Sequence, residues 1–209
     1  MTLRVWFKHF FLITLLIGAV VTVITSFFVQ PDAYEPYLDP IDAWEIFGVI
    51  LWYIVLGFVY SIVSQMGFFA YLVVHQFGLG IFRSFWNYVL VVLIGITLFD
   101  LVYLRYARAD NPESLVPYIV VAVVLFIYGL AVAYVKAKET NKKAFIPALF
   151  LMVVVTTLEW IPTLRIDDYQ SMMLMITPLL ACNTYQLLKL HRIVGVKEET
   201  ASPTPKTAK

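Results

Sequence analysis

The chain has 209 residues; 61% of them are hydrophobic, 14% are charged, and the formal net charge is +1. About 25% of the residues in a soluble domain are charged, so the additional apolar surface of this chain needs lipid to cover it. The composition therefore excludes a soluble protein. It also excludes a second, soluble domain, because no polar stretch is long enough to form a core of its own.

Apolar stretches of about twenty residues recur along the whole chain, and each can cross a hydrocarbon core of about 30 Å as a helix. We predict an all-α, polytopic integral membrane protein with six transmembrane helices, over 10–29, 45–66, 86–104, 117–135, 145–164 and 171–190. The first stretch is longer than the apolar part of a typical secretory signal, and no cleavage site of the A-x-A type follows it, so we interpret it as a retained span.

The distribution of basic residues predicts the orientation, because cytoplasmic loops carry an excess of Lys and Arg. With six spans and both termini in the cytoplasm, the inside holds Arg4, Lys8, Arg83, Lys136, Lys138, Lys142, Lys143, Lys189, Arg192, Lys197, Lys206 and Lys209. The outside holds Arg105, Arg108 and Arg165. We expect residues 1–195 to form the transmembrane domain. The polar, proline-containing segment 196–209 is expected to be a disordered cytoplasmic tail.

The stretch SQMGFFAYLVVHQFGLGIFRSFWN, residues 64–87, remains apolar well beyond the second predicted span. A seventh span here would weaken the charge asymmetry. Two interpretations remain: the second helix continues to about Val74 and tilts, kinks or projects into the headgroups, or HQFGLG forms a short re-entrant turn. The polar residues and glycines of this inner end are candidates for contact with a partner protein or lipid: Gln65, His75, Gln76, Gly78, Gly80, Arg83 and Asn87.

Three carboxylates form a second candidate group near the predicted outer boundary: Glu45, Asp100 and Glu159. Ionisable residues in membrane helices are costly and often functional, which suggests a cation site or an extracytoplasmic sensing surface. A structural explanation is also available. Asp100 can reach Arg105 or Arg108, and Glu159 can extend to the interface or pair with Arg165.

Small residues recur on the first two spans, at Gly18, Thr22 and Ser26 and at Gly57, Ser61 and Ser64. Such stripes allow the backbones of membrane helices to approach closely. They predict a contact between these two helices or between one of them and another protein.

The motifs of common enzymes are absent. The sequence has no H-E-x-x-H motif, G-x-S-x-G elbow, P-loop or kinase signature, and its three histidines are scattered. Cys182 is the single cysteine, so an intramolecular disulfide is excluded, and we expect it to be a small buried residue. We therefore predict no enzyme activity, no metal and no cofactor. Thr156, Thr157, Thr177, Asn183 and Thr184 are polar residues within spans, and hydrogen bonds between helices explain them as well as a transport pathway does.

The stretch WFKHFFLITLLIGAVVTVITSF and, more distinctively, SQMGFFAYLVVHQFGLGIFRSFWN resemble the KinB-signalling pathway activation proteins (KbaA-like) of spore-forming bacteria. The likeness extends from Trp6 to about Val194. It implies a six-span inner-membrane protein that a membrane sensor histidine kinase needs in order to feed the phosphorelay that starts sporulation. It implies no catalytic residues. The motif positions of the family fall on Ser64, Gln65, Gly67, His75, Gln76, Gly78, Gly80, Arg83 and Asn87.

Our first hypothesis is a non-enzymatic accessory protein of the bacterial cytoplasmic membrane that activates a sensor histidine kinase by contact within the bilayer. The expected partners are this kinase and phospholipid, and not nucleic acid. The alternative is a small transporter, or a lipid- or solute-binding protein, that uses Glu45, Asp100 and Glu159. A transporter normally has more polar residues at mid-depth than these spans contain.

Overall fold

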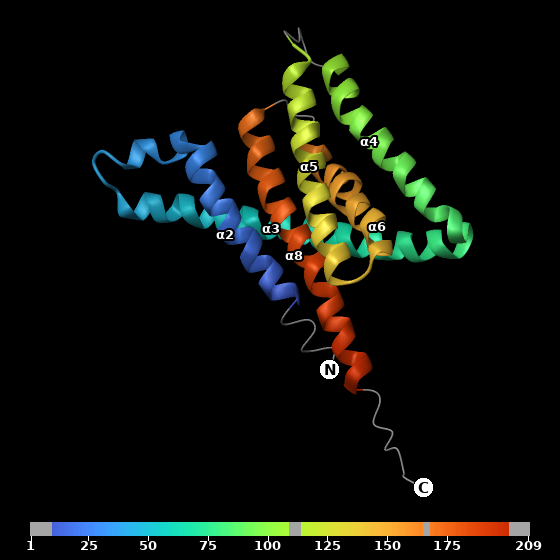
Figure 1. Cartoon of the computed structure of the whole chain (residues 1–209). Coiled ribbons are helices and arrows are strands. Elements are labelled where there is room, and N and C mark those ends of the chain that lie inside the picture. Colours follow the sequence, from blue (N-terminus) through green and yellow to red (C-terminus); the bar gives the residue numbers. More distant parts are fainter. Residues whose placement is uncertain (1–9, 109–113, 165–167, 201–209) are drawn as a thin grey trace.

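The computed structural model describes residues 10–108, 114–164 and 168–200, and these residues form helices joined by short turns (Figure 1). The long helices are α2 (Leu12–Val29), α3 (Ala43–Phe82), α4 (Trp86–Arg108), α5 (Val116–Glu139) and α8 (Tyr169–Thr200). The shorter elements are the 3₁₀-helices η2 (Pro31–Ala33), η3 (Glu35–Tyr37), η4 (Arg83–Phe85) and η5 (Lys142–Ala144), α6 (Phe145–Phe150), the π-helix η6 (Leu151–Val155) and α7 (Thr156–Leu164). The all-α fold class is confirmed.

Four stretches of the described chain are long and apolar enough to cross a membrane: Leu12–Val29, Ala43–Tyr103, Val116–Glu139 and Lys142–Leu164. The prediction of six spans is therefore supported only in part. The second and third predicted spans fall within one stretch of 61 residues, which contains α3, η4 and most of α4. The last predicted span, 171–190, is helical but is not among these four stretches.

Helix α3 is much longer than the predicted span over 45–66. Its 40 residues extend about 60 Å at 1.5 Å each, twice the thickness of a hydrocarbon core. Asp42 caps its start, accepting hydrogen bonds from the backbone N–H groups of Trp44 and Glu45. α3 runs obliquely across α2, α5 and α8 rather than along them (Figure 1).

The re-entrant turn considered for HQFGLG is not formed, because the helix continues through both glycines to Phe82. The chain turns one step later, at Arg83, whose φ of 47° is unusual for a residue with a side chain. Helix α4 then begins at Trp86. The glycines therefore lie inside the helix, and the turn lies after them.

The small residues of α2 and α3 face each other, as predicted. A Cβ added to Gly57 would lie 2.6 Å from the Cα of Ala19, and one added to Gly18 would overlap the hydroxyl of Ser61. Ser61 also donates a hydrogen bond to the backbone carbonyl of Thr14, 3.2 Å away. The stripes thus form an intramolecular contact, in which close backbone approach depends on the missing side chains.

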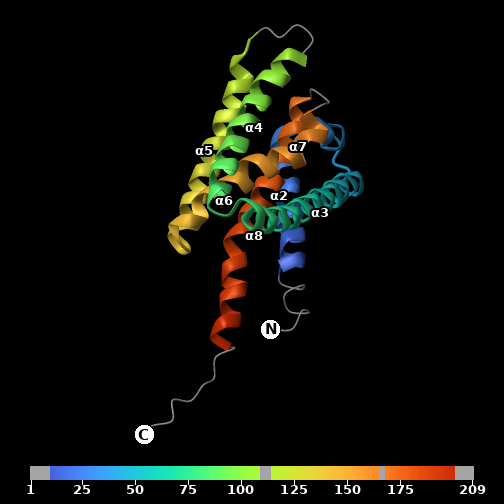
Figure 2. The same cartoon turned by 90° about the vertical axis from the view of Figure 1, so that its right-hand side faces the viewer.

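The segment α6–η6–α7 is the central element. In the apolar 18-residue window of Lys142–Leu164, 72% of the residues are buried, compared with 17% in the corresponding window of Ala43–Tyr103. α6 contacts α4 and α5, and α7 contacts α3 and α8. Figure 2 shows α4 and α5 side by side, with α4 rising from the end of α3 and α2 farther away. The predicted span over 145–164 thus occupies the middle of the bundle.

Helix α8 begins after Asp168, which accepts hydrogen bonds from the N–H groups of Gln170 and Ser171. Hydrogen bonds from the side chain and backbone of Ser171 hold the pKa of Asp168 below its ordinary value. The helix runs to Thr200, so the first part of the tail expected to be disordered, 196–200, is helical. The remainder of that tail, 201–209, lies outside the described residues. α2 begins and α8 ends at the same end of the molecule (Figures 1 and 2).

Candidate functional site

The end of α3 and the start of α4 form a corner that is held by aromatic packing. The indole N–H of Trp86 donates a hydrogen bond to Nδ1 of His75, with a distance of 3.0 Å. The ring of His75 stacks on Tyr71, with 5.7 Å between centroids. Gly78 lies directly against the indole, where a Cβ would overlap the ring. His75 and Gly78, which were predicted to contact a partner or lipid, therefore help to close the corner.

The other residues predicted at this inner end lie on the surface of the corner. Gln76, Gly80, Arg83 and Asn87 are exposed, and the three polar side chains make no hydrogen bond or ion pair with the described residues. They are surrounded by exposed apolar side chains, which are Phe77, Leu79, Ile81, Phe82 and Phe85. The corner thus combines an apolar surface with an unpaired guanidinium group and two amides.

Arg83 occupies a backbone conformation that favours glycine. Its φ of 47° and ψ of −117° resemble the first central residue of a type II′ turn, where a Cβ is strained. The arginine therefore stands at a turn for which glycine would be the usual residue.

Gln65 does not contact a partner or lipid, because its side chain is buried within the described chain at 3% exposure. Neither its amide oxygen nor its amide nitrogen has a hydrogen-bond partner. Sequence reasoning placed it in the inner group because it is polar and precedes His75. Its position on α3 instead directs it into the protein, one residue after the buried Ser64.

A polar network links α3, α7 and α8 in the interior. The side chain of Asn183 accepts a hydrogen bond from Ser64, at 2.7 Å, and donates to Glu159 and Thr156, at 2.7 and 2.9 Å. Gln186 donates to Ser64 at 2.6 Å. One oxygen of Glu159 and the amide oxygen of Gln186 have no partner within the described chain. The network connects three helices at a point where lipid cannot supply hydrogen bonds.

The predicted outer group of carboxylates is not assembled. Glu159 is 7% exposed and belongs to the interior network, whereas Glu45 and Asp100 are exposed. The first turn of α3 and the helix α4 lie on opposite sides of the molecule (Figure 1). Glu159 was expected at the interface because it precedes Trp160 and Pro162. It is buried because Gly67 leaves room for its carboxyl group. Arg165 lies outside the described residues.

Part of this network had a signal in the sequence. For Asn183 and Thr156, hydrogen bonds between helices were one of two explanations, beside a transport pathway, and Gln186 was missed. Gln186 follows Asn183 by three residues. The same spacing separates Thr156 from Glu159 and Ser61 from Ser64, and it places the two residues of each pair on one helix face. This spacing would have identified it.

The described residues contain no group of three or more His, Cys, Asp or Glu side chains that could hold a metal ion. Cys182 is buried, as predicted, with its sulfur 3.7 Å from the hydroxyl of Ser61. The polar network of the described interior therefore connects helices, and the corner presents polar groups among exposed apolar side chains.

Comparison with known proteins agrees with the resemblance in the two quoted stretches. The profile of a family described as KbaA, KinB-signalling pathway activation in sporulation, matches residues 18–193. The KinB-signaling pathway activation protein of Bacillus subtilis (strain 168) is 43% identical over 190 residues, which are 90% of this chain and 96% of the relative. No solved structure matches. The match of the profile to most of the chain and this level of identity show that the protein belongs to the KbaA family.

Proposed function

We propose that this protein activates a KinB-type sporulation pathway as a non-enzymatic accessory protein, by contacting a sensor histidine kinase within the membrane. The observation that carries the proposal is the exposed corner, where Gln76, Arg83 and Asn87 have no partner in the described chain. A partner protein can pair with these polar groups while its own apolar side chains pack against the surrounding apolar surface. The Bacillus subtilis relative is named a KinB-signaling pathway activation protein, which supports this role.

The proposed setting is the bacterial cytoplasmic membrane, with six spans and both termini in the cytoplasm. The basic residues support this orientation, because twelve of the fifteen Lys and Arg then lie inside. The common position of the start of α2 and the end of α8 is compatible with an even number of crossings. Because α3 is about twice as long as one crossing, its C-terminal part lies at the cytoplasmic interface in this arrangement.

The corner is suited to act on a kinase because it is rigid. The hydrogen bond between Trp86 and His75 and the contact of Gly78 with the indole fix the angle between α3 and α4. Activation requires that the corner bind one kinase conformation more tightly than another, since equal affinity would shift no equilibrium. A rigid surface makes such a difference because it does not adapt to both conformations.

Photo-crosslinking in the native membrane tests the proposed contact. Photo-reactive residues in place of the exposed Phe77, Leu79 and Ile81 leave the three polar side chains intact and are expected to capture a sensor histidine kinase. Those at the exposed apolar positions Val59 and Ile62 are expected to capture lipid. Arg83→Ala is expected to reduce capture and sporulation signalling while the protein still inserts. Capture of lipid alone at all five positions, together with normal signalling by Arg83→Ala, would contradict the proposal.

The transporter hypothesis loses the feature that suggested it. It was based on Glu45, Asp100 and Glu159 as an outer polar group, whereas Glu159 is buried and Glu45 and Asp100 are exposed on opposite sides of the molecule.

A further inference from the structure

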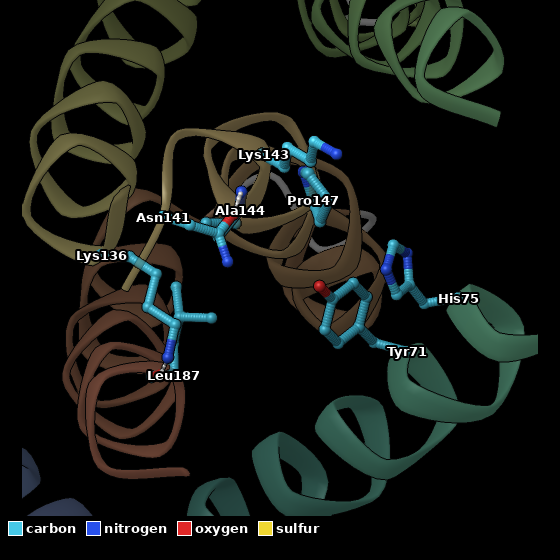
Figure 3. Close-up of a pocket in the computed structure, with 9 residues that line it drawn as sticks. Tyr71, His75, Lys136, Asn141, Lys143, Ala144, Pro147 and Leu187 are labelled. Carbon is cyan, nitrogen blue, oxygen red and sulfur yellow. Dashed lines mark hydrogen bonds between the residues drawn. The ribbon is translucent and has the colours of Figure 1, made fainter. Parts of the chain in front are cut away.

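A cavity of about 300 Å³ lies beside the corner, between α3, α5, the segment η5–α6 and α8 (Figure 3). Tyr71 and His75 line it from α3, Lys136 from α5, and Asn141 and Lys143 from the connection between α5 and α6. This volume is at the lower end of the range of about 300–1,000 Å³ that is typical of small-molecule sites.

The polar groups of this cavity are suited to an anion. It is lined by two lysines, a histidine, an asparagine and a tyrosine, and by no carboxylate. The hydroxyl of Tyr71 points toward the side of the cavity formed by Asn141 and Lys136 (Figure 3). Oδ1 of Asn141 accepts a hydrogen bond from the N–H of Ala144, so its amide nitrogen remains the donor that it can offer to a ligand.

The lysines also have structural surroundings. Nζ of Lys136 donates a hydrogen bond to the carbonyl of Leu187 at 2.7 Å, and Glu139 interacts with it electrostatically. An ammonium group has three donors, so a ligand oxygen can be added to this bond. Lys143 is exposed, and in Figure 3 its amino group points away from Asn141, Lys136 and Tyr71. Its flexible stem allows it to turn toward an anion at the entrance.

We propose that this cavity binds a phosphate group, supplied either by the headgroup of an anionic phospholipid or by a free phosphate in the cytoplasm. Phosphate accepts hydrogen bonds from several donors at once, and the tyrosine, asparagine and lysine groups surround the cavity from different elements. The bound group would connect α3 to α5 and to η5, next to the corner. The proposal does not rest on the kinase contact, because binding is measured on the purified protein alone.

The test uses the purified full chain in nanodiscs, with two probes. In the first arm, native mass spectrometry measures retention of phosphatidylglycerol from a mixture with phosphatidylcholine. In the second arm, nanodiscs of pure phosphatidylcholine are titrated with inorganic phosphate by calorimetry. Selective retention in the first arm identifies a headgroup site, and saturable heat in the second identifies a site for free phosphate.

Two variants and a matched control accompany both arms. Lys143→Gln and Tyr71→Phe are each expected to weaken binding about fivefold, through the lost charge and the lost hydrogen bond. Lys142→Gln is the control, because Lys142 is an exposed neighbour that does not line the cavity. Circular dichroism and thermal unfolding verify that each variant is folded. The proposal is overturned if neither probe binds, or if both variants weaken binding no more than Lys142→Gln does.

Discussion

The two parts of α3 use small and polar residues in opposite ways. In the middle part, residues 57–68, Gly57 and Ser61 contact α2, and Ser64 joins the network with α8. In the end part, residues 76–83, Gly80 has nothing within 4 Å of a built Cβ, and Gln76 and Arg83 are exposed. Small and polar residues therefore hold helices together in the middle part, whereas in the end part Gly78 packs against Trp86 and Gln76, Gly80 and Arg83 form an exposed surface.

The difference comes from the neighbours of each part. A serine or asparagine in an apolar helix is stabilising when another helix supplies its hydrogen-bond partner, and costly when lipid surrounds it. The middle part crosses α2, α7 and α8, whereas the end part extends toward α4. Substitutions in the middle part should therefore change mainly the stability of the fold, and those in the end part should change mainly the contacts with other molecules.

The largest difference is expected from the same change made in both parts. Gly57→Leu forces a side chain into the backbone of α2, which lies 2.6 Å from the missing Cβ, and should lower the free energy of unfolding by about 3 kcal/mol. Gly80→Leu meets no neighbour and should change it by no more than about 0.5 kcal/mol. Unfolding by SDS titration in bicelles measures both.

Gly80→Leu also tests the surface, because a bulky side chain there should interrupt the proposed contact and abolish signalling in a folded protein. Equal stability of the two variants would contradict the contact between α2 and α3. Normal signalling by Gly80→Leu would remove residue 80 from the proposed surface.

A smaller loss is expected from the interior network. Asn183→Ala removes bonds to Ser64, Thr156 and Glu159 and leaves these groups buried, so the free energy of unfolding should fall by about 2 kcal/mol. Thr177→Val on the same helix is the matched control, because Thr177 is exposed and bonds to the carbonyl of Met173 within its own helix. The same titration compares them, and a loss no greater than that of the control would show that the network does not stabilise the bundle.

The smallest change is a gain of stability at the end part. Arg83→Gly should raise the free energy of unfolding by about 1 kcal/mol, because glycine adopts a φ of 47° without the strain of a Cβ. Arg83→Ala keeps the Cβ and should give no such gain. Both variants lack the guanidinium group, so both should lose signalling if that group makes the proposed contact. Signalling retained in Arg83→Gly but lost in Arg83→Ala would indicate that the turn, rather than the charge, is what matters.

Sequence reasoning predicted the all-α fold and the burial of Cys182, and it gave the pairing of the small stripes of α2 and α3 as one of two alternatives. These features depend on composition and on spacing along single helices. The same reasoning assigned His75, Gly78 and Arg83 to one candidate contact group. In the structure His75 and Gly78 pack against Trp86, whereas Arg83 is exposed. Sequence reasoning placed Gln65 and Glu159 at surfaces, and both are buried. Gln65 is buried because of the face that α3 turns toward the other helices, and Glu159 is buried because it packs against Gly67. Neither arrangement follows from a local sequence pattern.

By itself, the sequence determined that the chain is built from apolar helices, that basic residues concentrate on one predicted side, and that the stretch 64–87 resembles one family. These properties follow from residue type and order, which fix local propensity, length and charge. The tertiary structure alone decided which polar residues find a partner on another helix and which remain exposed. The reason is that a hydrogen bond or a close backbone contact depends on how two helices cross, and the crossing is set by the packing of the whole bundle.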